Sequence, residues 1–273
     1  MFECVINISE GRDAEKLAAF ADLSGESLRD VHSDPDHHRS VFTLINRADD
    51  LTRDVRALIS SAVARLNLGE HAGVHPRLGV VDVVPFVALA DDQINVALQL
   101  RDDTARWMGE ELLVPTFLYG PLADGSVRTL PQVRREAFHE LAPDYGPARA
   151  HPSAGISAVG QRGQLVAWNI WLEGATLADA QRIARAIRSR AVRALGLNVG
   201  NYVQVSCNLI DVRETRPSEV YDAVNELLSD TARIVRCELV GLAPRSLLEH
   251  EDSARWAQLD LSARYSVEAT LGR

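Results

Sequence analysis

The sequence lacks the features that mark secreted and membrane proteins. Its 273 residues contain three cysteines, Cys4, Cys207 and Cys237, which are too few and too widely spaced to form a disulfide framework. They indicate reduced residues inside a core. No charged leader followed by an apolar stretch opens the chain, and no run of about 18 apolar residues occurs in it. We therefore expect a cytoplasmic protein with no membrane partner.

Positive charge is scarce, and almost all of it is carried by arginine. The formal net charge is −9, and Lys16 is the only lysine among 29 basic residues. Proteins that bind nucleic acids usually carry a basic excess, so no nucleic-acid partner is expected. Arginine recognises carboxylates through two parallel hydrogen bonds, although a bias in genome composition explains its abundance more simply.

Hydrophobic patterning predicts an α/β (α+β) fold built from two units. In the first unit, expected strands at 2–6, 28–32, 41–46, 80–89 and 114–119 alternate with expected helices at 13–22, 51–67 and 92–110. A connecting region rich in glycine and proline follows at 120–163. The second unit has expected strands at 165–172, 202–210 and 234–240 and expected helices at 177–195 and 217–229. We predict two stacked subdomains over 1–164 and 165–273, each a mixed sheet covered by helices, with a ligand cleft between them.

The segment 71–79, HAGVHPRLG, places two histidines and an arginine between an expected helix and an expected strand. Gly73 and Pro76 end the helical pattern, so His71 and His75 are expected to lie on a turn. A histidine in such a loop can act as a general base near neutral pH. Alternatively, it can bind the last carbonyl groups of the preceding helix.

A second polar segment, HSDPDHHR at 32–39, adds to the histidines, so that five of the eight lie between 32 and 75. Aspartate and histidine at this density are typical ligands of zinc or manganese. An Asp-Pro-Asp turn is also favoured by its backbone alone, because Asp34 and Asp36 can bind nearby amides. Adjacent histidines usually point in different directions, so His37 and His38 are not expected to share an ion. We expect no metal.

Two further segments could bind ligands. At 7–12, NISEGR, a strand gives way to a helix whose first amides could bind an anion, or Ser9 or Asp13 could simply cap the helix. The loop at 143–155 is too rich in glycine and proline for a helix. It is no phosphate-binding loop either, because the chain has no GxxxxGK[ST], no strand-linked GxGxxG and no GxSxG motif.

Taken together, these segments resemble the formiminotransferase family. The motifs that carry the resemblance are ECVINISEG at 3–11, DV at 30–31 with RSV at 39–41, and HPRLGVVDVVPF at 75–86. Further matches follow in the family's order and spacing: LYG at 118–120, RTLP at 128–131, PDYGP at 143–147, QVS at 204–206 with NL at 208–209, and LVGL at 239–242 with Pro244.

The resemblance implies two α/β subdomains, a homodimer, and transfer of a formimino group from N-formimino-L-glutamate to tetrahydrofolate, which serves as co-substrate in histidine degradation and one-carbon metabolism. His75 aligns with the family's catalytic histidine. The folate-binding loop would comprise Gly146, Pro147, Ala148, Arg149, Ala150, His151, Pro152, Ser153, Ala154 and Gly155. The residues expected to bind the formimino donor are Asn7, Asp34, Arg39, Arg77 and Asp82. Arg39 and Arg77 suit its carboxylates, and Asp34 or Asp82 suits a protonated formimino group.

The chain departs from the family pattern at Ile6, His38, Ala72, Val74 and Ala154, where the family has proline, asparagine, a basic residue, glutamate and tryptophan. These departures support an alternative, a diverged member that binds folate or an acidic metabolite without turnover. A lower alternative is a metal-dependent hydrolase that uses Asp34, Asp36, His37, His38, His71 and His75.

Overall fold

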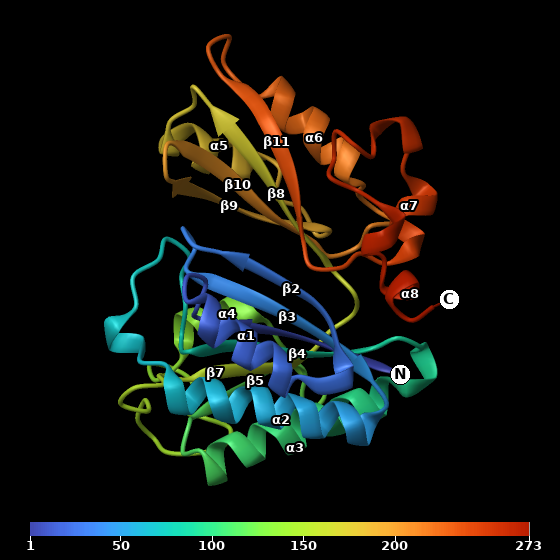
Figure 1. The fold of residues 1–273 in the computed structure, drawn as a ribbon. Coiled ribbons are helices and arrows are strands. Elements are labelled where there is room, and N and C mark those ends of the chain that lie inside the picture. Colours follow the sequence, from blue (N-terminus) through green and yellow to red (C-terminus); the bar gives the residue numbers. More distant parts are fainter. Residues whose placement is uncertain (273) are drawn as a thin grey trace. The chain divides into compact units, whose positions relative to one another are not determined.

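The computed structural model describes residues 1–272 and divides the chain into two compact units, the first ending at Gly163 and the second beginning at Gln164. Each unit contains one β-sheet with helices packed on it (Figure 1). The predicted α/β fold class is therefore confirmed.

The sheet of the first unit has seven strands in the order β2-β3-β1-β4-β7-β5-β6. β7 pairs in parallel with β4 and β5, and the other neighbours are antiparallel. This is a mixed sheet, as the sequence predicted. Its strands are β1 (Phe2–Ile8), β2 (Leu28–Asp34), β3 (Arg39–Asn46), β4 (Val81–Ala88), β5 (Thr116–Pro121), β6 (Val127–Arg128) and β7 (Ser157–Gln161).

Helices cover both faces of this sheet. The larger core lies under α1 (Ala14–Leu23), α2 (Ala48–Arg65) and α3 (Ile94–Glu111), which receive the alternate buried residues of β1, Cys4, Ile6 and Ile8. A smaller core on the opposite face includes Phe117 of β5 and Val133 of α4 (Leu130–Glu136). Because β4 supplies residues to both cores, both faces of β4 are covered.

The second unit is a four-stranded sheet in the order β11-β8-β10-β9, with helices on one face. All its pairings are antiparallel, so it is not the mixed sheet predicted for this unit. Trp168, Ile170 and Val205 of that face pack against buried residues of the helices in one core. The strands are β8 (Val166–Glu173), β9 (Val192–Val199), β10 (Tyr202–Leu209) and β11 (Arg233–Val240), and the helices are α5 (Leu177–Ala186), α6 (Pro217–Glu226), α7 (Arg245–His250) and α8 (Val267–Thr270).

The predicted helix at 177–195 is wrong in its second half. α5 ends at Ala186, and 192–199 form strand β9, in which Val192 and Ala194 are buried whereas Arg193 and Leu195 are exposed. The side chain of Ser189 accepts hydrogen bonds from the amides of 191 and 192, at 3.1 Å each, and so closes the turn between helix and strand. Pairing with β10 along the whole strand outweighs the helical propensity of its alanine and leucines.

The connecting region at 120–163 also holds more structure than predicted, namely β6, α4 and β7. α4 begins with a capping box, in which Thr129 and Gln132 each bind the other's backbone amide, and Pro131 lies in its first turn. β7 is a short central strand buried throughout, so it shows no alternation of polar and apolar residues.

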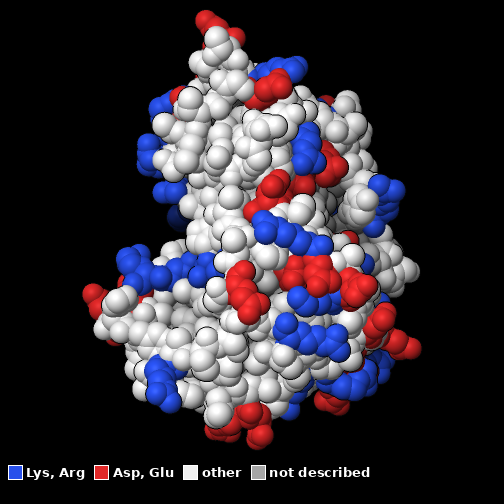
Figure 2. Space-filling view, turned by 60° about the vertical axis from the view of Figure 1, so that its left-hand side comes forward, with Lys and Arg blue, Asp and Glu red and all other residues white. Residues whose placement is uncertain are grey.

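None of the helices in residues 1–272 is long and apolar enough to cross a bilayer. On the face seen in Figure 2, acidic and basic side chains are interspersed. The net charge of −9 is thus not gathered into one acidic patch on that face.

Candidate active site

The loop that carries His75 is tied to the β2–β3 turn by the guanidinium of Arg77. Its Nη2 donates to the carbonyl oxygens of His75, at 2.7 Å, and of His37 in the turn, at 3.0 Å. Its Nη1 donates to the carbonyl oxygen of His38, at 3.2 Å, and to Nδ1 of His71, at 2.8 Å. Arg77 was expected to bind a substrate carboxylate, and the structure shows it holding the two histidine-containing segments together.

Gly73 lets these two segments approach closely. A Cβ atom at this position would lie 2.4 Å from the carbonyl oxygen of His37 and 2.8 Å from Cβ of His38. The next residue, Val74, donates its amide to the carbonyl oxygen of Asp36 at 3.3 Å. Only glycine fits here without moving the backbone.

The ring of His75 is held in one tautomer. Nδ1 lies 2.7 Å from the carbonyl oxygen of Pro76, which can only accept, so Nδ1 carries the proton and Nε2 is the basic atom. Burial and then the nearby Arg39 cation lower the pKa of His75 well below its ordinary value of 6.5. His75 is therefore neutral at pH 7, as a general base must be.

Asp82 of β4 is fully buried between two arginines. Oδ2 accepts from Nη1 of Arg39 on β3, at 2.6 Å, and from Nη2 of Arg134 on α4, at 2.7 Å. Oδ1 accepts from the amide of Leu78 at 2.6 Å. Burial alone would raise the pKa of Asp82, but the two arginines and their hydrogen bonds outweigh it and lower the pKa to about 2.

The surroundings of Asp82 carry an excess of positive charge. Burial, and then the Arg39 cation, lower the pKa of the Arg77 guanidinium to about 10. Nε of Arg39 also donates to Oδ1 of Asn7, at 3.1 Å, so the structure connects Asn7, Arg39 and Asp82, three of the residues expected to bind the donor. Such a site attracts an anionic ligand.

Sequence reasoning missed Arg134 as part of this group. Besides Asp82, Arg134 donates to the carbonyl oxygen of Pro76 at 3.3 Å, directly beside His75. The capping box from Thr129 to Gln132 could have revealed the helix that carries it.

The start of α1 does not bind an external anion in the way that the sequence suggested. Oε1 of Glu10 accepts from the amides of Gly11, Arg12 and Asp13, at 2.9, 2.8 and 3.1 Å. The carboxylate of Glu10 thus occupies these amide donors, and its negative charge interacts favourably with the positive end of the helix dipole. The interpretation of these amides as a site for an external anion is therefore wrong.

The cap of α1 is Asp13, one of the two candidates, whose Oδ1 accepts from the amides of Glu15 and Lys16. Ser9 instead donates to the carbonyl oxygen of Gly79 at 2.8 Å. Lys16 lies over the same corner, with Nζ 3.2 Å from Oδ2 of Asp13 and 3.8 Å from Oε2 of Glu10.

Asp34 closes the β2–β3 turn. Its Oδ1 accepts from the amides of Asp36 at 2.8 Å and His37 at 2.7 Å, which is the turn chemistry offered as the alternative to metal binding. Within 1–272, no three side chains of histidine, cysteine, aspartate or glutamate are grouped so that they could hold a metal ion.

The expected folate-binding loop is anchored to the loop of His75 at its C-terminal end. Gly155 forms a bridge with Gly79, and the amide of Val80 donates to the carbonyl oxygen of Ala154 at 2.9 Å. His151 closes the turn, since its Nδ1 accepts from the amide of Ala154 at 3.0 Å. Of the ten residues, Ala154 and Gly155 are buried, Pro147, His151 and Ser153 are partly buried, and Gly146, Ala148, Arg149, Ala150 and Pro152 are exposed.

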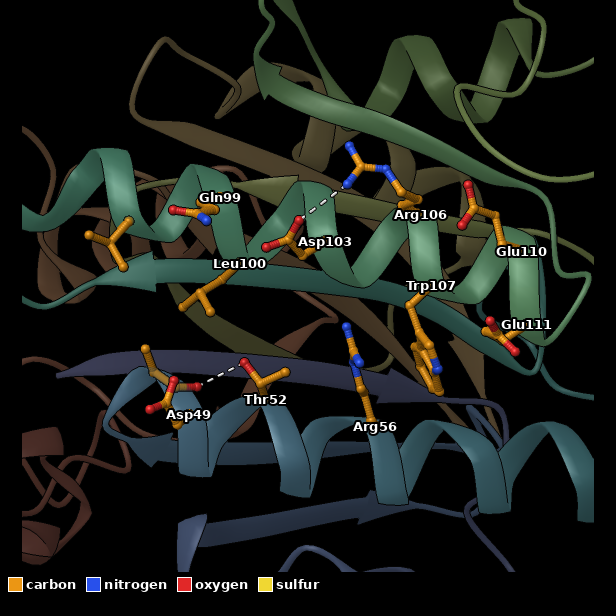
Figure 3. Close-up of a pocket in the computed structure, with 12 residues that line it drawn as sticks. Asp49, Thr52, Arg56, Gln99, Leu100, Asp103, Arg106, Trp107, Glu110 and Glu111 are labelled. Carbon is orange, nitrogen blue, oxygen red and sulfur yellow. Dashed lines mark hydrogen bonds and ion pairs between the residues drawn. The ribbon is translucent and has the colours of Figure 1, made fainter.

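A separate hollow of about 680 Å³ lies on the outer side of α2 and α3 (Figure 3). It is lined by charged side chains of both signs, including Arg56 and Asp103, and by Trp107, over whose ring Arg56 lies at 5.1 Å. None of the site residues expected from the sequence lines this hollow.

The chain is an α/β protein in which the loops around His75 lie beside a buried carboxylate paired with two arginines. Residues 1–162 match the family model described as formiminotransferase domain, N-terminal subdomain. Glutamate formimidoyltransferase of Thermoplasma acidophilum is 33% identical over 91% of this chain and 89% of its own length. The enzyme of the same name from Streptococcus pyogenes serotype M1 is 31% identical over 90% of both chains. The formimidoyltransferase-cyclodeaminase of Sus scrofa is 32% identical over 91% of this chain but 51% of its own length. The chain belongs to the formiminotransferase family.

Proposed function

We propose that the protein is a glutamate formimidoyltransferase, which transfers the formimino group of N-formimino-L-glutamate to tetrahydrofolate with His75 as general base. The names of its relatives support the reaction class. The observation that carries the role of His75 is its ring geometry, in which the Pro76 carbonyl fixes the proton on Nδ1 and leaves Nε2 basic.

In this mechanism, N5 of tetrahydrofolate attacks the carbon of the protonated formimino group. The π electrons of its C=N bond move to the terminal nitrogen, and a tetrahedral intermediate forms. Nε2 of His75 accepts the proton that N5 releases. The resulting imidazolium donates that proton to the glutamate nitrogen, and the bond from this nitrogen to carbon breaks. The electron pair on the terminal nitrogen then restores the C=N double bond, so that N5 carries the formimino group. One histidine thus acts as base and then as acid.

The arginines beside Asp82 are suited to hold the carboxylates of the donor. Arg39 and Arg134 share a single carboxylate, so the group retains positive charge that a dicarboxylate would balance. Asn7, whose side chain fixes Arg39, would position that arginine. We assign Asp34 and Arg77 to shaping the loops around the donor, since both hold backbone groups there.

We place the folate at the loop 146–155. Its link through Gly155 and Gly79 to the His75 loop supports this assignment, since the attacking N5 must come within reach of His75. The family resemblance further supports a cytoplasmic homodimer in which both substrates are small molecules.

The proposal is tested by mixing the purified protein with N-formimino-L-glutamate and tetrahydrofolate. Release of glutamate and the absorbance of methenyl-tetrahydrofolate after acidification report the reaction. The variant His75→Ala should lose turnover by about 10²-fold or more and keep its circular dichroism spectrum, in line with the weight of general acid–base catalysis. The exposed His139 provides the control, and His139→Ala should match the parent protein. Near-normal turnover in His75→Ala would remove it from this role.

A second candidate is a diverged member that binds folate or an acidic metabolite without turnover. It is favoured by Val74, an exposed apolar side chain directly before His75, at a position where the family has glutamate. Calorimetric binding of tetrahydrofolate with no turnover of any formimino donor would support this candidate. Turnover of one donor would exclude it.

A further inference from the structure

The ring of His38 is enclosed by groups that accept hydrogen bonds. Nδ1 lies 3.0 Å from the carbonyl oxygen of Ala72, and Nε2 lies 3.1 Å from Oε1 of Glu10. The ring stacks on that of His71, with centroids 4.0 Å apart. His38 has a φ of 49°, a left-handed conformation that histidine, asparagine and aspartate adopt more readily than most residues.

These contacts assign the charge within the stacked pair. A carbonyl and a carboxylate can only accept, so the two bonds of His38 are both made only when its two ring nitrogens carry protons. Nε2 of His71 lies 2.8 Å from the carbonyl oxygen of His38, and Nη1 of Arg77 contacts both ring nitrogens of His71. A guanidinium can only donate, so at least one nitrogen of His71 is unprotonated and the ring is neutral. The geometry therefore describes a cationic His38 stacked on a neutral His71.

The contacts of His38 lead to the loop of His75. Ala72 lies three residues before His75, and its carbonyl group receives the proton on Nδ1 of His38. Arg77 joins the carbonyl groups of His37 and His75, and the rings of these two histidines are 5.7 Å apart. At Gly73 there is no room for a side chain, because this loop lies directly against the β2–β3 turn.

We propose that His38 is a positioning residue which, as an imidazolium bound to Glu10, clamps the His75 loop through Ala72 and thereby sets the alkaline limit of the formimidoyl transfer. The inference rests on the proposed function. When His38 loses a proton, one of its two bonds is lost, because an unprotonated nitrogen then faces an acceptor.

Charged and titratable groups face His38 from two segments, the start of α1 and the loop of His75. Glu10, at the start of α1, contacts the ring, and Lys16 of α1 lies 3.8 Å from the other oxygen of that carboxylate. His71 and Arg77 approach from the His75 loop. Among these four groups, Glu10 is the anion and Lys16 and Arg77 are cations.

The test compares two variants with a control over a range of pH. In His38→Asn, the amide nitrogen can replace Nδ1 as donor to Ala72 but cannot titrate, and asparagine also tolerates the left-handed backbone. The alkaline fall of kcat/KM should therefore disappear, with the plateau kept within about threefold. His38→Ala should lower kcat/KM about tenfold or more at every pH, because a charge-assisted bond is lost. His139→Asn should keep the parent profile.

An alkaline limb that persists in His38→Asn, or a His38→Ala variant with the parent profile, would overturn the proposal. Titration of the histidine Cε1 protons by NMR shows whether His38 causes the alkaline fall of kcat/KM. If it does, the midpoint of that fall must equal the midpoint of the His38 titration. The same spectra separate this inference from the proposed function. Even without turnover, the His75 resonance should show an inflection at the His38 midpoint that vanishes in His38→Asn, and a missing inflection would refute the clamp alone.

Discussion

Arg134 and Asp82, separated by 52 positions in the sequence, are joined by a hydrogen bond of 2.7 Å between Nη2 and Oδ2. The same oxygen also accepts from Arg39, so one buried carboxylate links α4 to β3 through β4. Two guanidinium groups can lie this close together only because the carboxylate between them is ionised.

Arg134 is expected to bind the donor, whereas its neighbour Arg135 is not. The side chain of Arg135 is exposed and pairs with Glu136. Replacing Arg134 by alanine should raise the KM for N-formimino-L-glutamate about tenfold, the effect of losing one charge-assisted hydrogen bond. Steady-state kinetics of Arg134→Ala and Arg135→Ala provide the comparison, and equal KM values in both variants would contradict the assignment.

Asp82 is expected to stabilise the first unit. In Asp82→Asn, Arg39 and Arg134 would remain without the charge that they surround, and loss of one partner of a buried ion pair destabilises a protein by about 3–5 kcal/mol. Urea denaturation measures the change. Asp50→Asn removes the surface pair with Arg53 and should have a much smaller effect, because solvent screens that pair. Similar midpoints for both variants would show that the ion pairs of Asp82 do not stabilise the fold.

The acid limb of the reaction should lie below the ordinary pKa of histidine. The base form of His75 is the unprotonated form, and burial together with Arg39 keeps its pKa well below 6.5. As the pH falls, His75 therefore remains unprotonated past 6.5, and kcat/KM should decline only at lower pH. A profile of kcat/KM with its acid midpoint at 6.5 or above would be inconsistent with this environment.

Gly73 is expected to be essential for activity, although it lies in a solvent-exposed part of the loop. In Gly73→Ala, the new Cβ would meet the carbonyl oxygen of His37 and push the loop away from the turn. Displacement of a catalytic group by about 1 Å can lower kcat/KM by about 10²-fold. Gly163→Ala is the matched control, because a Cβ there meets no atom within 4 Å. Parent-like kinetics in Gly73→Ala would show that the loop tolerates separation from the turn.

Much of the fold follows from local patterns in the sequence. β1 and α2 were predicted because their apolar residues recur with the strand and helix periods, and the turn at Asp34 because its side chain can bind its own backbone. β9 was misassigned, since its stability comes from pairing with β10, a partner that no local pattern reveals.

In the candidate site too, residues within sequence motifs could be predicted, whereas residues that depend on tertiary contacts could not. Asn7, Arg39 and Asp82 were each selected as donor-binding candidates, and the structure shows that hydrogen bonds join them. Arg134 was missed because a short helix within a region rich in proline and glycine brings it to Asp82. The hydrogen bonds from Arg77 to backbone carbonyl groups were likewise not predictable, because they depend on where two distant turns meet.

Lys16, the sole lysine, lies beside the carboxylate that contacts His38, and its side chain is 39% exposed. Reagents that acylate amines therefore have one side-chain target in this chain, and it adjoins the loops of the site. A fluorophore or a fluorine label attached there would report local motion during substrate binding without any engineered cysteine.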